Sequence, residues 1–193
     1  MTIRTIASTC RRSVRLLALM SVGLTGGAFL SPATAHADPA PMCYRGPDEN
    51  AYYKITNVES GESLNVSHRL QLNGAPVIQW EYAGAANEQW RAVCVAPFSY
   101  KLVARHSGLV LDVAAGSTVD GAKVVQYRYH GGANQQWGIG RVGSAGALMT
   151  FEVSNKHSSK VLDVAEDGRG IQQSYASAGD PGRLWTFEQV GTV

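Results

Sequence analysis

Short apolar runs separated by turn-forming pairs recur from about residue 52 to the end of the chain. Runs such as Tyr100 to Val103 and Lys123 to Tyr129 are rich in β-branched and aromatic residues, and Ser-Gly, Asn-Gly or Asp-Gly turns bound them. Beyond residue 37, no stretch keeps a helical apolar period over the roughly ten residues that a helix requires. The pattern predicts an all-β protein built from hairpins.

The same unit occurs three times in this region. Each copy passes from an apolar strand through a small-residue turn to an apolar triplet with a central Asn or Asp, and then through an Asx-Gly pair to a tryptophan. The triplets are Leu64-Asn65-Val66, Leu111-Asp112-Val113 and Leu162-Asp163-Val164, and the tryptophans are Trp90, Trp137 and Trp185. The first two copies keep an offset of 47 residues throughout, whereas the third has drifted.

We therefore expect one domain over residues 52–193, made of repeats at about 52–95, 99–142 and 149–190. A repeat of this length also fits a propeller blade, but propellers close with about four to eight blades. Three copies instead favour a fold with threefold pseudosymmetry. One indole per repeat, each ahead of another apolar strand, predicts that the three tryptophans are buried in the core.

The first 37 residues have the pattern of an export signal, with basic residues, an apolar run and a small-x-small tripeptide in that order. These features are Arg4, Arg11, Arg12 and Arg15, then Leu16 to Leu30, then Ala35-His36-Ala37. We expect residues 1–37 to be removed, leaving a short segment, 38–51, ahead of the repeats in a secreted protein of bacterial type. The Arg pair leaves twin-arginine export open beside ordinary secretion.

Removal of residues 1–37 takes four of the seventeen Lys and Arg and none of the fifteen Asp and Glu, which leaves a net charge of −2. The remaining basic residues are scattered along the chain. This balance offers no electrostatic footprint for nucleic acid or an anionic membrane. No apolar run of the sequence reaches the length of a bilayer-spanning helix, so membrane insertion is not expected.

Export would place the remaining cysteines in an oxidising compartment. Cys10 lies in the export signal, so Cys43 and Cys94 remain as a pair, and we expect them to form a disulfide. The alternative is two free buried thiols. A lone pair lacks the ligands for a structural zinc site, and no metal or cofactor is expected.

The second copy resembles a repeat of the ricin B-type lectin family. Asn134-Gln135-Gln136-Trp137 carries the Gln-x-Trp signature of that family, and Leu111-Asp112-Val113 precedes it at the right place. The signature is degraded to Glu88-Gln89-Trp90 in the first copy and to the tryptophan alone in the third. The resemblance covers residues 52–190 and implies a β-trefoil, a barrel of hairpins capped by three more.

The resemblance also implies a sugar-binding site in the second repeat. The family uses the triplet Asp, an aromatic ten residues before the tryptophan, a His three residues further on, and the Asn before Gln-x-Trp. Here these are Asp112, Tyr127, His130 and Asn134. An ionised Asp accepts hydrogen bonds from paired hydroxyls, and a flat aromatic covers the apolar face of a sugar ring. Taken singly, each of these residues has a structural explanation; together they favour binding.

The other two copies keep less of this set. The first offers Asn65, Trp80 and Asn87, with Ala83 in place of the His, and is expected to be weaker or altered. The third keeps Asp163 and is expected to be inactive or repurposed. Its aromatic is assigned to Tyr175, with Ser174 as the alternative one residue earlier, and Gly182 replaces the Asn.

We do not expect catalysis. Glycoside hydrolysis usually needs two carboxylates facing each other across one bond, and the triplet acids Asp112 and Asp163 belong to different lobes. No nucleophile elbow, His-rich metal motif or phosphate loop occurs. The expected ligand is a glycan of galactose, xylose or mannose type, which the sequence does not choose between. The alternative is a secreted trefoil that docks onto a protein as an inhibitor or scaffold.

Overall fold

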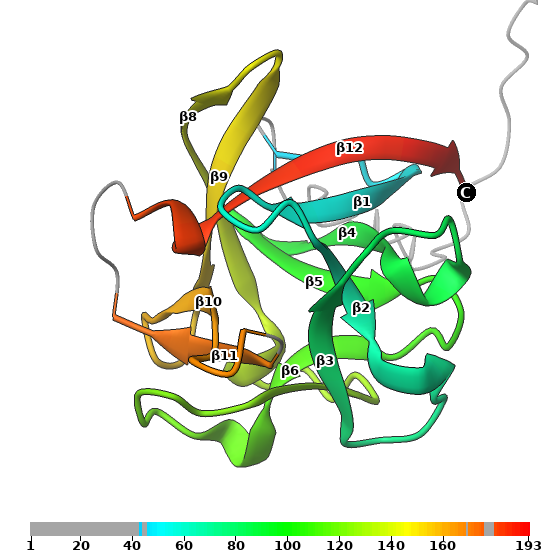
Figure 1. The fold of residues 1–193 in the computed structure, drawn as a ribbon. Coiled ribbons are helices and arrows are strands. Elements are labelled where there is room, and N and C mark those ends of the chain that lie inside the picture. The colour runs from blue at the N-terminus through cyan, green and yellow to red at the C-terminus, as the bar shows by residue number, and fades with distance from the viewer. Residues whose placement is uncertain (1–42, 44–45, 169, 176–179) are drawn as a thin grey trace, which may run out of the picture. The chain divides into compact units, whose positions relative to one another are not determined.

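The computed structural model describes residues 43, 46–168, 170–175 and 180–193, and the predicted export signal and the segment up to Met42 lie outside the described residues. The described chain consists of strands joined by turns and short 3-10 segments (Figure 1). Each repeat contributes four strands. They are β1 (Ala51–Asn57), β2 (Ser63–Val66), β3 (Ala75–Trp80) and β4 (Gln89–Ala96); β5 (Ser99–Ala104), β6 (Val110–Val113), β7 (Val124–Tyr127) and β8 (Trp137–Ala145); and β9 (Leu148–Asn155), β10 (Val161–Val164), β11 (Ile171–Ser174) and β12 (Leu184–Thr192).

The first and last strands of the repeats form a closed barrel. Strand β1 pairs with β4, β4 with β5, β5 with β8, β8 with β9, β9 with β12 and β12 with β1, all antiparallel. Closure of the ring leaves the barrel without the unpaired edges that invite aggregation. The middle strands form three hairpins, β2–β3, β6–β7 and β10–β11, one from each repeat.

The three hairpins meet one another and cap the barrel. Ala75 and Pro76 of β3 pair with Gln126 and Val125 of β7, and an isolated bridge joins Ile78 to Gly170 ahead of β11. Barrel and cap together are a β-trefoil, which confirms the fold class predicted from the repeats.

Alternation of side chains along the barrel strands explains why these residues form strands. In β1 the residues of the apolar series Tyr53 and Ile55 are buried, whereas the intervening Lys54 and Thr56 are only partly covered. A period of two places one series in the core and the other outside. The pattern that predicted hairpins thus also decides which face of each strand is inside.

The repeat tryptophans occupy equivalent places in the core and have no solvent exposure. Each indole Nε1 donates a hydrogen bond of 2.9 to 3.1 Å to the carbonyl of the leucine that opens the triplet of its own repeat. The pairs are Trp90 with Leu64, Trp137 with Leu111 and Trp185 with Leu162. Burial of the indoles is therefore achieved with their only polar atom satisfied, as predicted for the core.

The predicted disulfide is present between Cys43 and Cys94, whose Cα atoms are 6.1 Å apart. It ties the segment ahead of β1 to β4. The hydroxyl of Tyr100 on β5 donates a 3.2 Å hydrogen bond to the carbonyl of Cys43 and supports the same connection.

Candidate functional site

The four residues that sequence analysis assigned to the second repeat lie around one pocket. Asp112 projects from β6 and Tyr127 from the end of β7. His130 follows on the loop, and Asn134 lies on the 3-10 segment η4 (Ala133–Gln135). All four line a cavity of about 690 Å³, with Arg128 and small residues completing its wall. The hairpin and the following loop thus bring these residues together.

Asp112 is 3% exposed and lies at the base of this pocket. Burial raises the pKa of its carboxyl above the usual value, because the charged form loses water. Hydrogen bonds from Gln135 and Asn134 and the nearby His130 ring act in the opposite direction. Gln135 Nε2 is 2.8 Å from Asp112 Oδ2 and holds the carboxylate in place.

The histidine of this pocket presents a defined nitrogen to the carboxylate. The backbone N–H of Gly132 donates to His130 Nδ1 at 3.2 Å, so the neutral ring carries its proton on Nε2. Nε2 lies 3.8 Å from Asp112 Oδ2, beyond direct hydrogen bonding. The His130 ring also contacts Tyr127 edge to face, with centroids 6.2 Å apart. The pocket therefore combines a carboxylate acceptor, an N–H donor and an aromatic ring.

Gln135 organises the loop of this site, a role that sequence analysis did not assign. It is fully buried. Its Nε2 donates to Asp112 and to the carbonyl of Arg128, and its Oε1 accepts from the backbone N–H of His130. The Gln-x-Trp motif could have indicated this role. Its first Gln, which marks the repeat, bonds both the Asp112 carboxylate on the strand and the backbone of the loop that carries His130.

The first repeat has a second pocket, of about 620 Å³, in the equivalent place. Asn65, Trp80 and Asn87 all line it, as expected, together with Glu88 and Tyr82. Trp80 is 44% exposed at this pocket. The structure therefore groups the three predicted residues, although their polar contacts differ from those of the second repeat.

Glu88 is the residue that sequence analysis missed in this first pocket. It precedes the tryptophan at the same distance as Gln135 does, and it is buried. Glu88 Oε1 accepts from Asn65 Nδ2 at 3.2 Å, and Glu88 Oε2 accepts from the backbone N–H groups of Ala83 and Ala85 at 2.9 and 3.1 Å. The degraded signature Glu-x-Trp was the available signal.

In the third repeat, strand register places Ser174, rather than Tyr175, in the aromatic's position. Ser174 pairs with Val161 of β10, as Tyr127 pairs with Val110 of β6. The assignment of Tyr175 to this position is therefore wrong. The reason is the connection between the two strands, which is four residues shorter than in the second repeat. The assignment of Tyr175 corresponds to a connection only three residues shorter, so it falls one residue too late.

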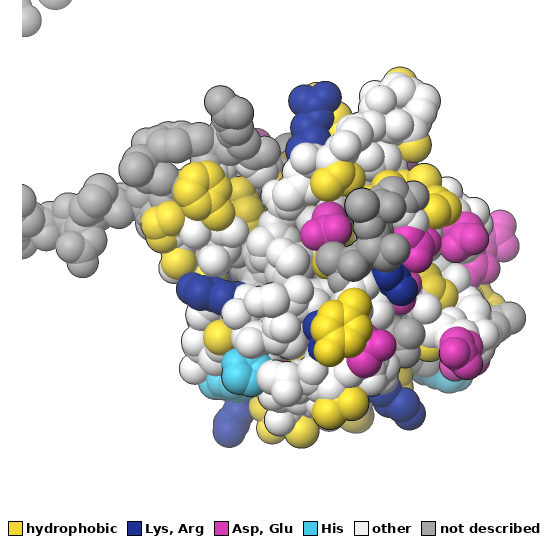
Figure 2. Space-filling view, turned by 90° about the vertical axis from the view of Figure 1, so that its left-hand side faces the viewer, with side chains coloured by type: hydrophobic (Ala, Val, Ile, Leu, Met, Phe, Trp, Pro, Cys, Tyr) yellow, Lys and Arg dark blue, Asp and Glu magenta, His cyan; other side chains and the backbone are white. Residues whose placement is uncertain are grey.

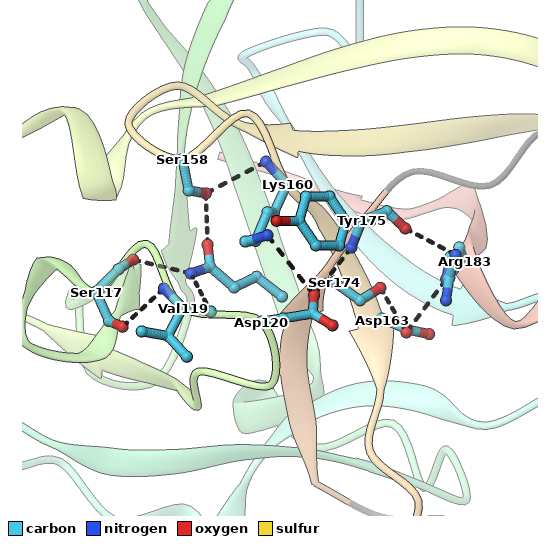
Figure 3. A network of polar contacts seen from close by, with 10 residues as sticks. Ser117, Val119, Asp120, Ser158, Lys160, Asp163, Ser174, Tyr175 and Arg183 are labelled. Carbon is cyan, nitrogen blue, oxygen red and sulfur yellow. Dashed lines mark hydrogen bonds and ion pairs between the residues drawn. The ribbon is translucent and has the colours of Figure 1, made fainter.

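The carboxylate of Asp163 is engaged by its own repeat (Figure 3). Ser174 Oγ donates to Asp163 Oδ2 at 2.6 Å, and Arg183 Nε lies 3.2 Å from the same oxygen. Arg183 Nε also lies 3.4 Å from Asp180 Oδ2. Tyr175 is 70% exposed, with Lys160 Nζ 3.2 Å from its ring centroid. Ser174 and Arg183 therefore bond the Asp163 carboxylate, whereas the equivalent carboxylate of Asp112 lines a pocket.

Gly182 stands where the second repeat has Asn134. Its carbonyl accepts a buried 2.7 Å hydrogen bond from Asn57, as the carbonyl of Asn134 accepts from Asn155 at 3.0 Å. A Cβ at Gly182 would lie 2.7 Å from Glu59 Oε2. The exposed Glu59 side chain would have to move to admit a larger residue, and Gly182 itself offers no side-chain group to a ligand.

Metal-binding residues, apolar helices and surface charges of the described part of the chain bear on other kinds of function. Within it no cluster of three or more His, Cys, Asp or Glu residues is arranged to hold a metal ion. No helix there has the length and apolar character needed to span a membrane. On the described part of the face that carries β8 to β11, basic and acidic side chains are interspersed, without a continuous basic patch (Figure 2).

Barrel, cap and threefold repeat define a β-trefoil, and the family comparison agrees. The model of the ricin-type beta-trefoil lectin domain-like family matches residues 44–127 and 93–174. The chain belongs to this family. A search of curated proteins returned no significant match.

The chain is also similar to solved structures, three of which follow. The designed threefold-symmetric protein ThreeFoil is 40% identical, with a TM-score of 0.68 over 72% of this chain and 99% of that one. The exo-β-1,3-galactanase 1,3Gal43A from Clostridium thermocellum is 34% identical with a TM-score of 0.68, over 75% of this chain and 31% of the galactanase. This chain thus spans about a third of that enzyme. The Macrolepiota procera ricin B-like lectin in complex with lactose is 21% identical, with a TM-score of 0.62 over 75% and 99%, and shares the fold.

Proposed function

We propose that the protein is a lectin that binds neutral sugars, mainly through its second repeat and without catalysis. The observation that carries the proposal is the convergence of Asp112, Tyr127, His130 and Asn134 on one pocket. The family membership and the lactose complex of the Macrolepiota procera lectin support it.

The chemistry of the pocket suits a sugar ring. Ionised Asp112 accepts hydrogen bonds from two hydroxyl groups, and these charge-assisted bonds are stronger than neutral ones. Tyr127 offers a flat apolar face to the C–H side of the ring. His130 Nε2–H supplies a donor beside the carboxylate. The Asn134 side chain lines the same pocket, and its amide nitrogen donates to the carbonyl of Val113. A galactose-, xylose- or mannose-type sugar meets these requirements.

The same pocket argues for binding without hydrolysis. Among the described residues that line it, Asp112 is the one carboxylate. Hydrolysis usually requires an acid and a second carboxylate about 5 to 9.5 Å apart across the scissile bond. Asp163 belongs to another repeat and is engaged by Ser174 and Arg183. A bound sugar would therefore be held and released intact.

We further propose that the protein acts outside the cell. The export-type pattern of residues 1–37 supports this location, although that segment lies outside the described residues. The Cys43–Cys94 disulfide supports it too, since disulfides persist in oxidising compartments.

A glycan array followed by calorimetric titration tests the proposal. A single shallow site is expected to bind a monosaccharide with a Kd on the order of 0.1 to 1 mM. Asp112→Ala is expected to weaken this by roughly tenfold or more, since charge-assisted bonds are lost. Asp163→Ala is the matched control, because it removes the equivalent carboxylate of a filled site.

The outcome also decides between the lectin and a protein-docking trefoil. Retention on a sugar column and elution by free sugar support the lectin. No binding on the array, or an unchanged Kd in folded Asp112→Ala, would contradict the second-repeat site and favour a trefoil that docks onto a protein.

A further inference from the structure

The first two repeats exchange an acid and an amide at the base of their pockets. The second repeat places Asp112 against Gln135, and the first places Asn65 against Glu88. Asn65 and Glu88 lie 47 residues before Asp112 and Gln135, respectively. The amide nitrogen donates to the carboxylate in both cases, at 2.8 Å in the second repeat and 3.2 Å in the first. The exchange keeps one such hydrogen bond and one carboxylate in each pair. It reverses which partner lies on the strand, the acid Asp112 in the second repeat and the amide Asn65 in the first.

The contacts fix the orientation of the Asn65 amide. The ionised carboxylate of Glu88 only accepts hydrogen bonds, so Asn65 must turn its Nδ2 toward Glu88. Its Oδ1 then accepts from Asn87 Nδ2 at 2.9 Å, and Asn87 Nδ2 also donates to the carbonyl of Val66. With these bonds made, Asn65 retains one N–H and one lone pair.

Asp112 has a different capacity. Its carboxylate has lone pairs and no proton when ionised, so every ligand group that bonds to it must be a donor. A sugar with two free hydroxyls meets this requirement. An ether oxygen in place of one hydroxyl would present lone pairs to the carboxylate, with no hydrogen bond to compensate for lost hydration.

We infer that the two pockets read different substitution states of a sugar. The second pocket requires a pair of free hydroxyls, whereas the first accepts a ring in which one of the pair is an acceptor only, as in an ether, an ester or a glycosidic linkage. This inference rests on the proposed lectin function. Asn65 is then a specificity-determining residue. The second pocket selects terminal, unsubstituted sugars, and the first also admits substituted or chain-internal ones.

Glu88 serves this division as a positioning residue. Besides Asn65 it binds the backbone N–H groups of Ala83 and Ala85, and it is buried beneath the loop. Its carboxylate is thus directed at the protein, not offered to two ligand hydroxyls. Glu81 also lines this pocket, but it is exposed at the rim, where water competes for its hydrogen bonds. Trp80 supplies the stacking face that Tyr127 supplies in the second pocket.

The test uses methyl glycosides of galactose, xylose and mannose together with their mono-O-methyl ethers as probes. Nuclear magnetic resonance titration resolves the two pockets, because the Trp80 indole reports on the first and the His130 ring on the second. For a glycoside that binds both pockets, an ether at a contacted position is expected to weaken binding at His130 about tenfold or more. At least one ether should keep its affinity at Trp80 within about threefold.

Equal sensitivity of the two reporters to every ether would overturn the inference and leave the proposed function intact. No response of either reporter to any glycoside would instead overturn the proposed function, and the inference with it. The two failures are therefore distinguishable in one series on the unmodified protein.

A double exchange tests the residues themselves. Asn65→Asp with Glu88→Gln recreates the pair of the second repeat without changing net charge, and it should bring the ether sensitivity of the first pocket to that of the second. Asn65→Asp alone places two carboxylates together and is expected to need the second change. The reverse exchange, Asp112→Asn with Gln135→Glu, should relax the second pocket. Unchanged ether preferences in a folded double exchange would contradict the role of Asn65, and the ether series decides the matter should either variant fail to fold.

Discussion

The hydroxyl of Ser174 donates a 2.6 Å hydrogen bond to Oδ2 of Asp163. Ser174 lies opposite Val161, in the strand position where the second repeat carries an aromatic ring. Together with Arg183, it turns the acid of the third repeat toward the protein itself. Equivalent acids in one pseudosymmetric fold therefore have different surroundings. Asp163 is bonded to Ser174 and Arg183, whereas Asp112 lines the pocket to which we assign sugar binding.

This contrast predicts a crossed result for two alanine variants. Asp163→Ala should lower the free energy of unfolding by about 1 to 3 kcal/mol, because Ser174 and the partly buried Arg183 lose their acceptor, while sugar affinity stays within about twofold. Asp112→Ala should lose affinity with a smaller effect on stability. Urea unfolding and calorimetric titration of both variants provide the measurement. Parallel effects of the two changes on affinity would contradict the assignment.

The sequence predicted a threefold fold because one unit recurs three times, with a tryptophan in each copy. The resemblance to ricin B-type repeats predicted the β-trefoil and the residues of the second pocket, among them Asp112. Tyr175 was misplaced because the shortened connection changes the pairing of β11, and register is decided by strand contacts that a spacing count does not contain. Glu88 was missed because its effect depends on which atom of Asn65 faces it, and only the folded loop determines that.

Burial of Asp112 predicts that sugar binding depends on pH. The ionised carboxylate is the form that accepts two hydroxyls, and burial raises the pKa of that group. Affinity should therefore fall as the pH is lowered, and the fall should begin at a higher pH than an ordinary aspartate would give. Calorimetric titration between about pH 3.5 and 7 measures it. An affinity that is constant across this range would exclude ionised Asp112 as the acceptor.

Folding stability should respond to the same group in the opposite direction. Because its pKa is higher in the folded than in the unfolded chain, the stabilising contribution is present at low pH, below the unfolded value of about 3.8, and is lost as the pH rises through the folded value. Asp112→Asn should therefore gain stability relative to the unmodified protein on going from pH 3 to pH 7. Thermal unfolding of both proteins at the two pH values is the control for the binding experiment.

Loss of the disulfide should destabilise the fold without removing the sugar site. Cys43→Ser with Cys94→Ser opens a connection of 51 positions and should cost about 2 to 4 kcal/mol, mainly by freeing the unfolded chain. Denaturant unfolding measures the change. Reduction of the unmodified protein is the matched control and should give a similar loss. The denatured full chain should show one reactive thiol, from Cys10, before reduction and three after it; three before reduction would contradict the bridge.

The core tryptophans should be equivalent in energy as well as in position. Replacement of Trp90, Trp137 or Trp185 by Phe removes an indole N–H bond to a backbone carbonyl and leaves a small cavity. Each change should cost about 2 to 4 kcal/mol. Urea unfolding of the three variants checks the expectation. A cost near zero for one of them would show that its repeat does not share the common core.

Two pockets of unequal selectivity should favour polymers over monosaccharides. When one chain reaches both pockets, the second contact forms at a high effective concentration, and avidity rises without any new contact. Trp80→Ala removes the exposed ring of the first pocket and should leave the monosaccharide Kd of the second pocket within about twofold. Binding to a polysaccharide of the same sugar should weaken by roughly tenfold or more. Tyr175→Ala removes an aromatic that is more exposed but lies outside both pockets, and it should change neither value. Affinity electrophoresis on the polysaccharide, beside calorimetry with the monosaccharide, makes the comparison. Equal losses in the Trp80 and Tyr175 variants would contradict a role for the first pocket in polymer binding, because the effect would then follow general surface hydrophobicity.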